Sequence, residues 1–146
     1  MSEMSGDINN IVEWLMYEEQ NIFAVAIIGS GGNIVFQTDN WDISSSIGEI
    51  NQLIAHNPGG GSDEYYSGVS KPPVSSITIS DVKYLIVEST SERKVGTNPG
   101  GQGHLLICPI PAGGPGALVC YVSPEIGPRD ALIEVENYAQ KLIGLI

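Results

Sequence analysis

Apolar residues recur at helical spacing near both ends of the chain. Over residues 7–20 and again over residues 129–143, one stripe of each segment is apolar, which predicts two amphipathic helices. The stripes consist of Ile8, Ile11, Val12 and Leu15 in the first segment and of Ala131, Val135, Tyr138, Ala139 and Leu142 in the second. Each helix is therefore expected to bury one face in a core.

Trp14, Tyr17 and Ile133 are large apolar residues that fall outside these stripes. Trp14 and Tyr17 lie i, i+3 from each other, so two aromatic rings share a face that the core does not need. That face suits either a ligand or the packing of the two terminal helices against each other. On the last helix Ile133 lies among polar residues, the pattern of a contact patch, although single exposed isoleucines are also common.

Short apolar runs separated by turn residues predict three strand pairs between the helices. Glycine-rich residues 29–33 join the first pair, and Ser80-Asp81 forms the turn of the second. Pro109 in the third pair predicts a sheet edge or a bulge, because proline cannot donate a ladder hydrogen bond. The pairs are 24–28 with 34–38, 77–79 with 82–87, and 105–110 with 117–122.

A shorter helix separates the first and second pairs. Ser46 and Glu49 form a capping-box pattern at its start, and Pro58 ends it. Its apolar positions are Ile47, Ile50, Leu53 and Ile54. The order helix, two strands, helix, about four strands, helix predicts an α+β fold, an antiparallel sheet with helices over its faces. We expect a single domain over residues 1–146.

Two segments lack apolar periodicity and are predicted to be loops. Residues 57–76 form a long loop rich in glycine and proline, whose two tyrosines either contact a partner or fold back over the domain. Residues 89–103 form a second polar, glycine-rich excursion, which contains Arg93 and Lys94.

The charge balance argues against several kinds of partner. With 17 acidic and six basic residues the net charge is −11, which argues against nucleic acid, since phosphate contacts need clustered Lys and Arg. The same scarcity disfavours membrane phosphoinositides. Four of the six basic residues fall between 83 and 129, which leaves a local basic spot open. The chain has neither a run of about 18 apolar residues nor a signal-peptide pattern, so a cytoplasmic protein is expected.

No arrangement of reactive side chains indicates catalysis. The glycine-rich residues 29–33 are followed by a strand and lack the lysine of a phosphate-binding loop. His56 and His104 are far in sequence from other metal ligands, and the acidic residues are scattered without an acid and base pair. We therefore expect a protein that is not an enzyme and needs no cofactor or metal.

Cys108 and Cys120 flank the third turn. If that turn is centred near residue 114, the two cysteines lie opposite each other on paired strands, where a disulfide or a metal pair is conceivable. We favour two reduced core thiols, because a cytosolic chain rarely keeps a disulfide and no further ligands accompany them.

Three segments in order resemble the profilin family, closest to the profilins of Asgard archaea. Trp14-Leu-Met-Tyr17 followed by residues 24–37 is similar to the Trp-x-x-Tyr helix and the Ala-x-Ile-x-Gly hairpin of that family. Residues 82–87 resemble its central strand, and residues 117–121 and 138–142 resemble its last strand and C-terminal helix. The resemblance implies a sheet with the N- and C-terminal helices on one face and a shorter helix on the other.

The same resemblance implies binding of an actin monomer, or of an archaeal actin homologue, through the late strands and the start of the last helix. Bound in this way, the monomer still adds to a growing filament end while spontaneous nucleation is suppressed. The matching positions are Lys83, Arg93, Lys94, Arg129, Ile133, Glu134 and Asn137. Charges further apart than about 8 Å are screened at physiological salt, so local ion pairs and apolar contact must supply the affinity.

A second family surface, between the terminal helices, binds proline-rich peptides by stacking aromatic rings on a polyproline II helix. The matching positions are Trp14, Tyr17 and Tyr138, while Lys141 takes a place where some family members present a ring. Profilins of this kind are expected to be monomers. The same element order also fits a roadblock-type or longin-type dimeric scaffold for small GTPases, although such modules do not need the leading Trp-x-x-Tyr helix.

Overall fold

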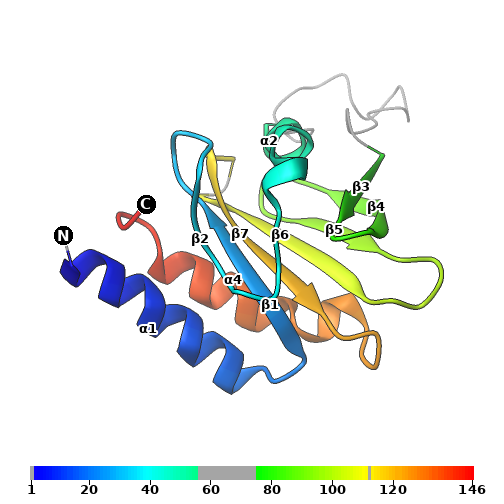
Figure 1. The fold of residues 1–146 in the computed structure, drawn as a ribbon, viewed down its shortest axis with the longest axis horizontal. Coiled ribbons are helices and arrows are strands. Elements are labelled where there is room, and N and C mark those ends of the chain that lie inside the picture. Colours follow the sequence, from blue (N-terminus) through cyan, green and yellow to red (C-terminus); the bar gives the residue numbers. More distant parts are fainter. Residues whose placement is uncertain (1, 56–74, 112) are drawn as a thin grey trace.

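The computed structural model describes residues 2–55, 75–111 and 113–146. Its centre is one antiparallel sheet of seven strands in the order β2-β1-β7-β6-β5-β4-β3 (Figure 1). The strands are β1 (Ile22–Ile28), β2 (Ile34–Gln37), β3 (Ser76–Ile79), β4 (Val82–Ser89), β5 (Lys94–Thr97), β6 (His104–Ile110) and β7 (Gly116–Val122).

Helices cover both faces of this sheet, which confirms the predicted α+β fold. Figure 1 shows α1 and α4 side by side on one face and α2 on the other. The helices are α1 (Ser2–Glu18), α2 (Ile47–Ile54) and α4 (Leu132–Lys141), with the short 3-10 helices η1 (Ser44–Ser46) and η3 (Pro128–Asp130) leading into the last two. In the described ranges no helix is both long enough and apolar enough to span a membrane.

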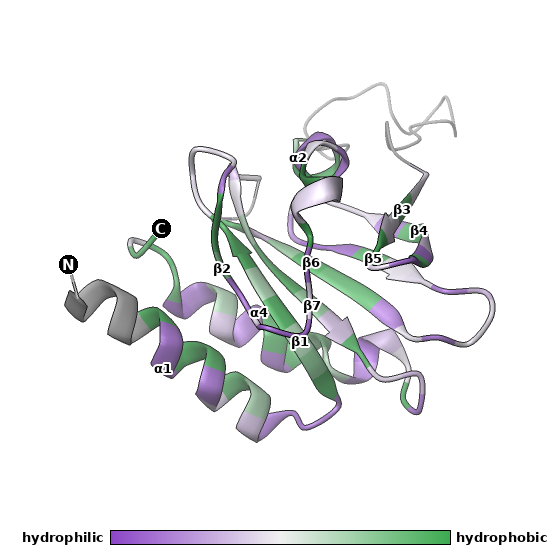
Figure 2. Ribbon diagram, in the orientation of Figure 1, coloured by the Kyte–Doolittle hydropathy of each residue, from purple (hydrophilic) through white to green (hydrophobic). Residues whose placement is uncertain are grey.

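The two terminal helices bury the stripes predicted for them. Leu15, Val135 and Leu142 are fully buried against the face of the sheet that carries Leu106 and Cys120. Figure 2 shows the apolar and polar residues alternating around α1 and α4, with the central strands apolar. Because burying one such aliphatic side chain stabilises a fold by about 1.5–3 kcal/mol, this contact fixes which sides of the helices face outward.

The opposite face of the sheet forms a second core. Ile50, Leu53 and Ile54 of α2 pack there with Trp41, which precedes the helix, and with Tyr84 of β4. Strands β6 and β7 are thus covered on both sides, and almost every residue in them is buried. A continuous apolar run is the pattern expected of such a strand.

The starts of two helices differ from the predictions. Helix α1 begins at Ser2 rather than at residue 7, and α2 begins at Ile47 without the predicted capping box. The buried Ser46 hydroxyl instead donates a hydrogen bond to the Thr78 carbonyl of β3. The Ser46 hydroxyl, which the sequence pattern assigned to the capping of α2, therefore binds a backbone carbonyl of β3 instead.

The turn predicted at Ser80-Asp81 is confirmed. Both residues have left-handed backbone, with φ of 51° and 69° respectively. Two successive positive φ angles are the requirement of a type I′ turn, whose twist matches the strands that it joins.

The predicted loop 89–103 is wrong at its centre, where β5 pairs with both β4 and β6. Only Val95 gives this strand an apolar signal. At Gly96 a Cβ atom would lie 3.1 Å from the Cβ of Tyr84, so the strand packs closely with a residue that carries no strand signal.

The cysteine register differs from the prediction by two residues. Cys108 pairs with Leu118 and Cys120 with Leu106, so the cysteines are not opposite each other. Both are free and buried, as favoured, and burial raises the pKa of each thiol, to about 12 for Cys108. Pro109 pairs with Ala117 of β7, while the pairing of β6 with β5 ends at Ile107, so the proline lies where β6 has one neighbour, as predicted.

The predicted loop 57–76 lies outside the described residues except at its end, where Ser76 already belongs to β3. His56 and both tyrosines of that segment also lie outside the described residues.

Candidate functional site

The outer side of α4 carries an exposed apolar residue among polar ones, as the sequence predicted. Ala131, Val135 and Tyr138 face the core, which turns Ile133 outward with 69% of its surface exposed. Glu134 and Asn137 flank it on the outer side of the helix. Ile133 is therefore an apolar residue that a partner can reach.

Strand β4 extends this surface beside the helix. Tyr84 packs into the core on the α2 side, so the alternation of a strand places Lys83 and Leu85 on the side of α4. Leu85 pairs with Thr97 of β5, and both Leu85 and Lys83 are exposed, because α4 packs mainly over β6 and β7. We call Lys83, Leu85, Glu88, Arg129, Ile133, Glu134 and Asn137 the α4 surface.

Glu88 joins the strand to the helix through two arginines. Its Oε2 atom lies 3.2 Å from Nη1 of Arg93, while its Oε1 atom accepts a hydrogen bond from Nη2 of Arg129. Arg93 continues the network, with Nε 2.7 Å from Glu136 of α4 and Nη2 3.5 Å from Glu92. The β4–β5 connection and the last helix are therefore held together by ion pairs as well as by packing.

The two arginines differ in their freedom. The side chain of Arg93 is 24% exposed and is engaged by carboxylates, and the hydrogen bond to Glu136 raises its pKa. The side chain of Arg129 is 67% exposed and touches Glu88 alone among the described residues. Of the two, Arg129 is the cation that a partner can reach, and Arg93 positions the surface from beneath.

The start of the last helix is fixed by two further contacts. His104 Nε2 lies 2.8 Å from the Ile126 carbonyl oxygen and so donates to it, which leaves Nδ1 to accept from the Thr97 hydroxyl at 2.9 Å. The Asp130 carboxylate accepts from the backbone N–H of Gly127 at 2.9 Å. These bonds define where η3, and with it Arg129, lies on the sheet.

Lys94 does not belong to this surface, and that prediction was wrong. Lys94 is fully buried, and it pairs with Ile107, whose side chain belongs to the core on the α2 side. Directly paired residues of an antiparallel sheet project to the same face, so Lys94 lies on the face away from α4. Burial lowers its pKa to about 8.

The predicted proline-binding face is only partly open. Trp14 and Tyr17 are 57% and 68% exposed, with ring centroids 5.8 Å apart and planes nearly perpendicular, so they do not serve to pack the terminal helices together. With Glu13 they line a shallow hollow. Tyr138 is buried, and the Lys141 ammonium lies 5.5 Å from the centre of its ring, so Tyr138 does not form the expected third wall.

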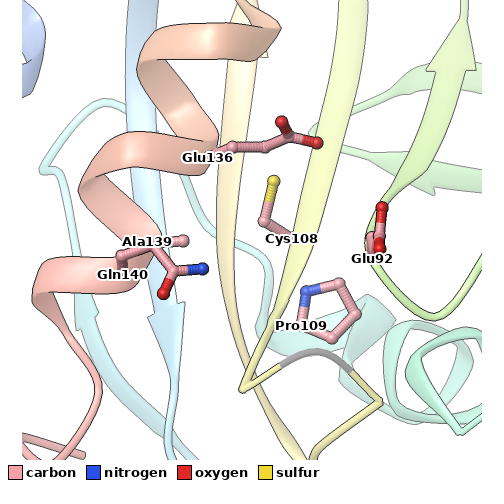
Figure 3. A pocket seen from close by; sticks show the side chains of 6 residues that line it. All are labelled: Glu92, Cys108, Pro109, Glu136, Ala139 and Gln140. Carbon is pink, nitrogen blue, oxygen red and sulfur yellow. The ribbon is translucent and has the colours of Figure 1, made fainter.

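A crevice between α4 and β6 holds no catalytic arrangement. Figure 3 shows the Glu136 carboxylate and the Cys108 sulfur directed into the same space, with Glu92 and Pro109 on the far side. Burial and the neighbouring Glu136 raise the pKa of Cys108, which keeps the thiol protonated and a poor nucleophile. Within the described parts of the chain, no group of three or more His, Cys, Asp and Glu side chains could hold a metal ion.

The carboxylate partners of the arginines were missed in the sequence. Glu88 and Glu136 are 48 positions apart, and no local pattern links either to Arg93. Leu85 could have been found, since it alternates with Tyr84 in a strand that also carries the predicted Lys83. The network requires the sheet order, which sequence spacing does not supply.

Comparisons with known proteins agree on one family. No protein-family model matches the chain. It is 48% identical over 143 residues to Loki profilin-2 of Lokiarchaeum sp. (strain GC14_75), covering 98% of this chain and 100% of that protein. The solved LokiProfilin2/Rabbit Actin Complex matches with a TM-score of 0.84 and 47% identity, covering 95% of this chain and 97% of that one. The LokiProfilin1/Rabbit Actin Complex matches with a TM-score of 0.82 and 42% identity, covering 100% and 98% of the two chains.

The ion-pair network makes a prediction about stability. Arg93→Met should lower the free energy of unfolding by about 1–3 kcal/mol, because partly buried carboxylates lose their donor. Arg129→Met, the matched control on the same Glu88, should cost less than about 1 kcal/mol, since that pair faces water. Urea unfolding followed by circular dichroism measures both, and equal losses would contradict the assigned roles.

Lys94 makes a prediction about pH. Its folded pKa of about 8 lies below the ordinary lysine pKa of 10.5, so the unfolded chain binds more protons between these values and stability rises with pH there. The Lys94→Met variant lacks the amine and therefore lacks its contribution to this pH dependence. The variant's advantage in unfolding free energy should therefore be largest below pH 8 and should shrink as the pH rises toward 10. A difference in unfolding free energy that stays constant between pH 8 and pH 10 would contradict a buried Lys94 amine with a lowered pKa.

Proposed function

The chain belongs to the profilin family, and on that premise we propose that it binds monomeric actin, or an archaeal actin homologue, through the α4 surface. The proposal is supported by the exposure of Ile133 at the centre of that surface. It is also supported by two similar proteins, LokiProfilin1 and LokiProfilin2, which were solved in complexes with rabbit actin. The dimeric GTPase scaffold is set aside, because the relatives are profilins.

The composition of the α4 surface suits a protein partner. Ile133 and Leu85 supply apolar area, and Lys83 and Arg129 supply exposed cations at its rim. An apolar centre that excludes water, with charges around it, is the arrangement in which few residues carry most of the binding energy. Because the chain is strongly acidic, these local cations are the groups able to pair with an acidic partner.

Binding at this surface would make the protein a regulator of polymerisation. It would hold actin as a monomer, slow spontaneous nucleation and still permit addition at the growing end. We expect it to act as a monomer in the cytoplasm, in association with the actin cytoskeleton. Phosphoinositides are not part of the proposal, because Lys83, Arg129 and Lys141 are the exposed cations among the described residues, fewer than the roughly four to eight basic residues of a typical anionic-lipid site.

The central residue gives the direct test. Ile133→Asp should weaken binding to monomeric actin at least tenfold, because it places a charge in the apolar centre of the contact. Ile143→Asp is the matched control, since Ile143 is also exposed but follows the end of α4. Titration of fluorescent monomeric actin measures the affinity, and a polymerisation assay measures the lag before filament growth.

Two outcomes would count against the assignment. No binding by the unaltered protein at tens of micromolar would contradict the function itself. Equal affinity for Ile133→Asp and Ile143→Asp would mean that the surface is misplaced.

Charge reversal at Lys83 and Arg129 together should also weaken binding, whereas Lys141→Glu at the far end of α4 should not.

We also propose that the rings of Trp14 and Tyr17 bind proline-rich peptides. The support is their high exposure and their edge-to-face contact, which leaves ring faces free to stack on a polyproline II helix. With Tyr138 buried, the site has two ring walls, and we expect weak affinity.

Replacing the tryptophan tests this second surface. Trp14→Ala should lose binding to a decaproline peptide while retaining actin binding, since the two surfaces are separate. Phe23→Ala is the control, because Phe23 is an exposed ring on a different part of the molecule. Isothermal titration of the peptide measures both variants, and unchanged peptide affinity in Trp14→Ala would exclude this site.

A further inference from the structure

A small pocket lined by aromatic rings lies on the face of the sheet away from α4. It forms where the segment between β2 and α2 crosses in front of the sheet (Figure 1). Trp41 of that segment, Tyr84 of β4 and Tyr121 of β7 supply three rings from three separate parts of the chain. The other lining residues are Ala24, Asn40, Ile79, Ser80 and Val82.

The three rings are arranged around Tyr121. Its ring centroid lies 6.4 Å from that of Trp41 and 6.4 Å from that of Tyr84, with planes inclined at 39° and 65°. The Tyr121 hydroxyl donates to the Gln102 carbonyl at 2.7 Å, and the ring also meets Phe23 at 6.0 Å. These contacts hold the central ring in place.

Tyr84 has a polar group with no hydrogen-bond partner among the residues that the structure describes. The residue is 1% exposed, and its hydroxyl makes no hydrogen bond to any residue in the described parts of the chain. Burial raises the pKa of Tyr84, so the group stays a neutral hydroxyl that can both accept and donate. Buried hydroxyls are normally hydrogen-bonded, and Tyr84 is one of the residues that line the pocket, so a ligand there with a polar hydrogen or a lone pair would supply the missing partner.

The charge around the pocket selects the sign of that ligand. Asp39, Asp42 and Asp81 are exposed, and each is the sequence neighbour of a residue that lines the pocket. Lys83 lies on the opposite face of the sheet because it adjoins the inward-facing Tyr84. A cation is therefore favoured over an anion.

We propose that this pocket binds an alkylated ammonium group. Aromatic ring faces attract cations through the ring quadrupole, and clustered rings are the usual binding site for methylated ammonium groups. An ammonium that keeps one N–H can also donate to the Tyr84 hydroxyl. The pocket volume of about 190 Å³ is below the roughly 300–1,000 Å³ of sites for whole drug-sized ligands, so it admits a head group and not a large molecule.

Trp41 provides the readout. The chain has two tryptophans, so Trp14→Phe leaves Trp41 as the single fluorophore, at the pocket. In that background, titration with choline or with trimethylammonium chloride should change Trp41 fluorescence in a saturable way. Sodium chloride at equal concentration should leave it unchanged, which separates binding from ionic strength.

The Tyr84 hydroxyl is tested by a variant that keeps the ring. Tyr84→Phe removes an unpartnered oxygen and should fold normally, which circular dichroism checks. Its affinity for trimethylammonium, which carries an N–H, should fall about tenfold, as expected for loss of a hydrogen bond to a charged group. Its affinity for tetramethylammonium, which has neither an N–H nor a hydroxyl group, should be unchanged. Equal losses for the two cations, or none, would overturn the role of the hydroxyl.

A neutral probe tests the role of charge. The analogue of choline in which carbon replaces nitrogen has the same shape without the charge, and it should bind at least tenfold more weakly. Equal binding of the two, or no saturable response to either cation, would overturn the proposal. A short peptide carrying trimethyl-lysine separates the two sources of the group: tighter binding than choline assigns the pocket to a protein side chain, and weaker binding assigns it to a free amine.

Discussion

The central strands of the sheet are apolar on both faces, and this constraint determines the rest of the structure. Strands β6 and β7 bury almost every side chain, so neither face can be left to water. The terminal helices cover one face and α2 the other. Because α4 must turn Val135 and Leu142 toward the sheet, its opposite side, with Ile133, is presented to solvent without any further device.

The same packing sets the shape of the α4 surface. Helix α4 packs mainly over β6 and β7, and β4, two strands away from β6 in the sheet, keeps Lys83 and Leu85 exposed. The surface is a step between a helix and a strand, and the Glu88 and Arg93 pairs tie the two levels together. On the other side of the sheet, the aromatic pocket is lined by Trp41, Tyr84 and Tyr121, beside the core that α2 covers. The two surfaces for which we propose partners thus lie on opposite faces of the sheet.

Much of this could be predicted from the sequence where the signal is local. The stripes of α1 and α4, the turn at Ser80-Asp81 and the exposure of Ile133 follow from periodicity and from turn chemistry. Strand β5 could not, because Gly96 is selected by its closeness to Tyr84, a contact between distant residues. Lys94 was misplaced for the same reason: the resemblance put it in an exposed loop, and only the pairing with Ile107 shows that it faces the core.

Glu88 is shared by Arg93 and Arg129, and this affects how the α4 surface can respond to a binding partner. The two arginines hold different oxygens of one carboxylate. If Arg129 leaves Glu88 to pair with an acidic group of a partner, Arg93 still pairs with Glu88. The exchange therefore avoids the free-energy cost of a buried carboxylate without a cation. An ion pair formed by only two residues would carry that penalty in full. Arg129 can thus be released from its intramolecular ion pair at a small cost in free energy.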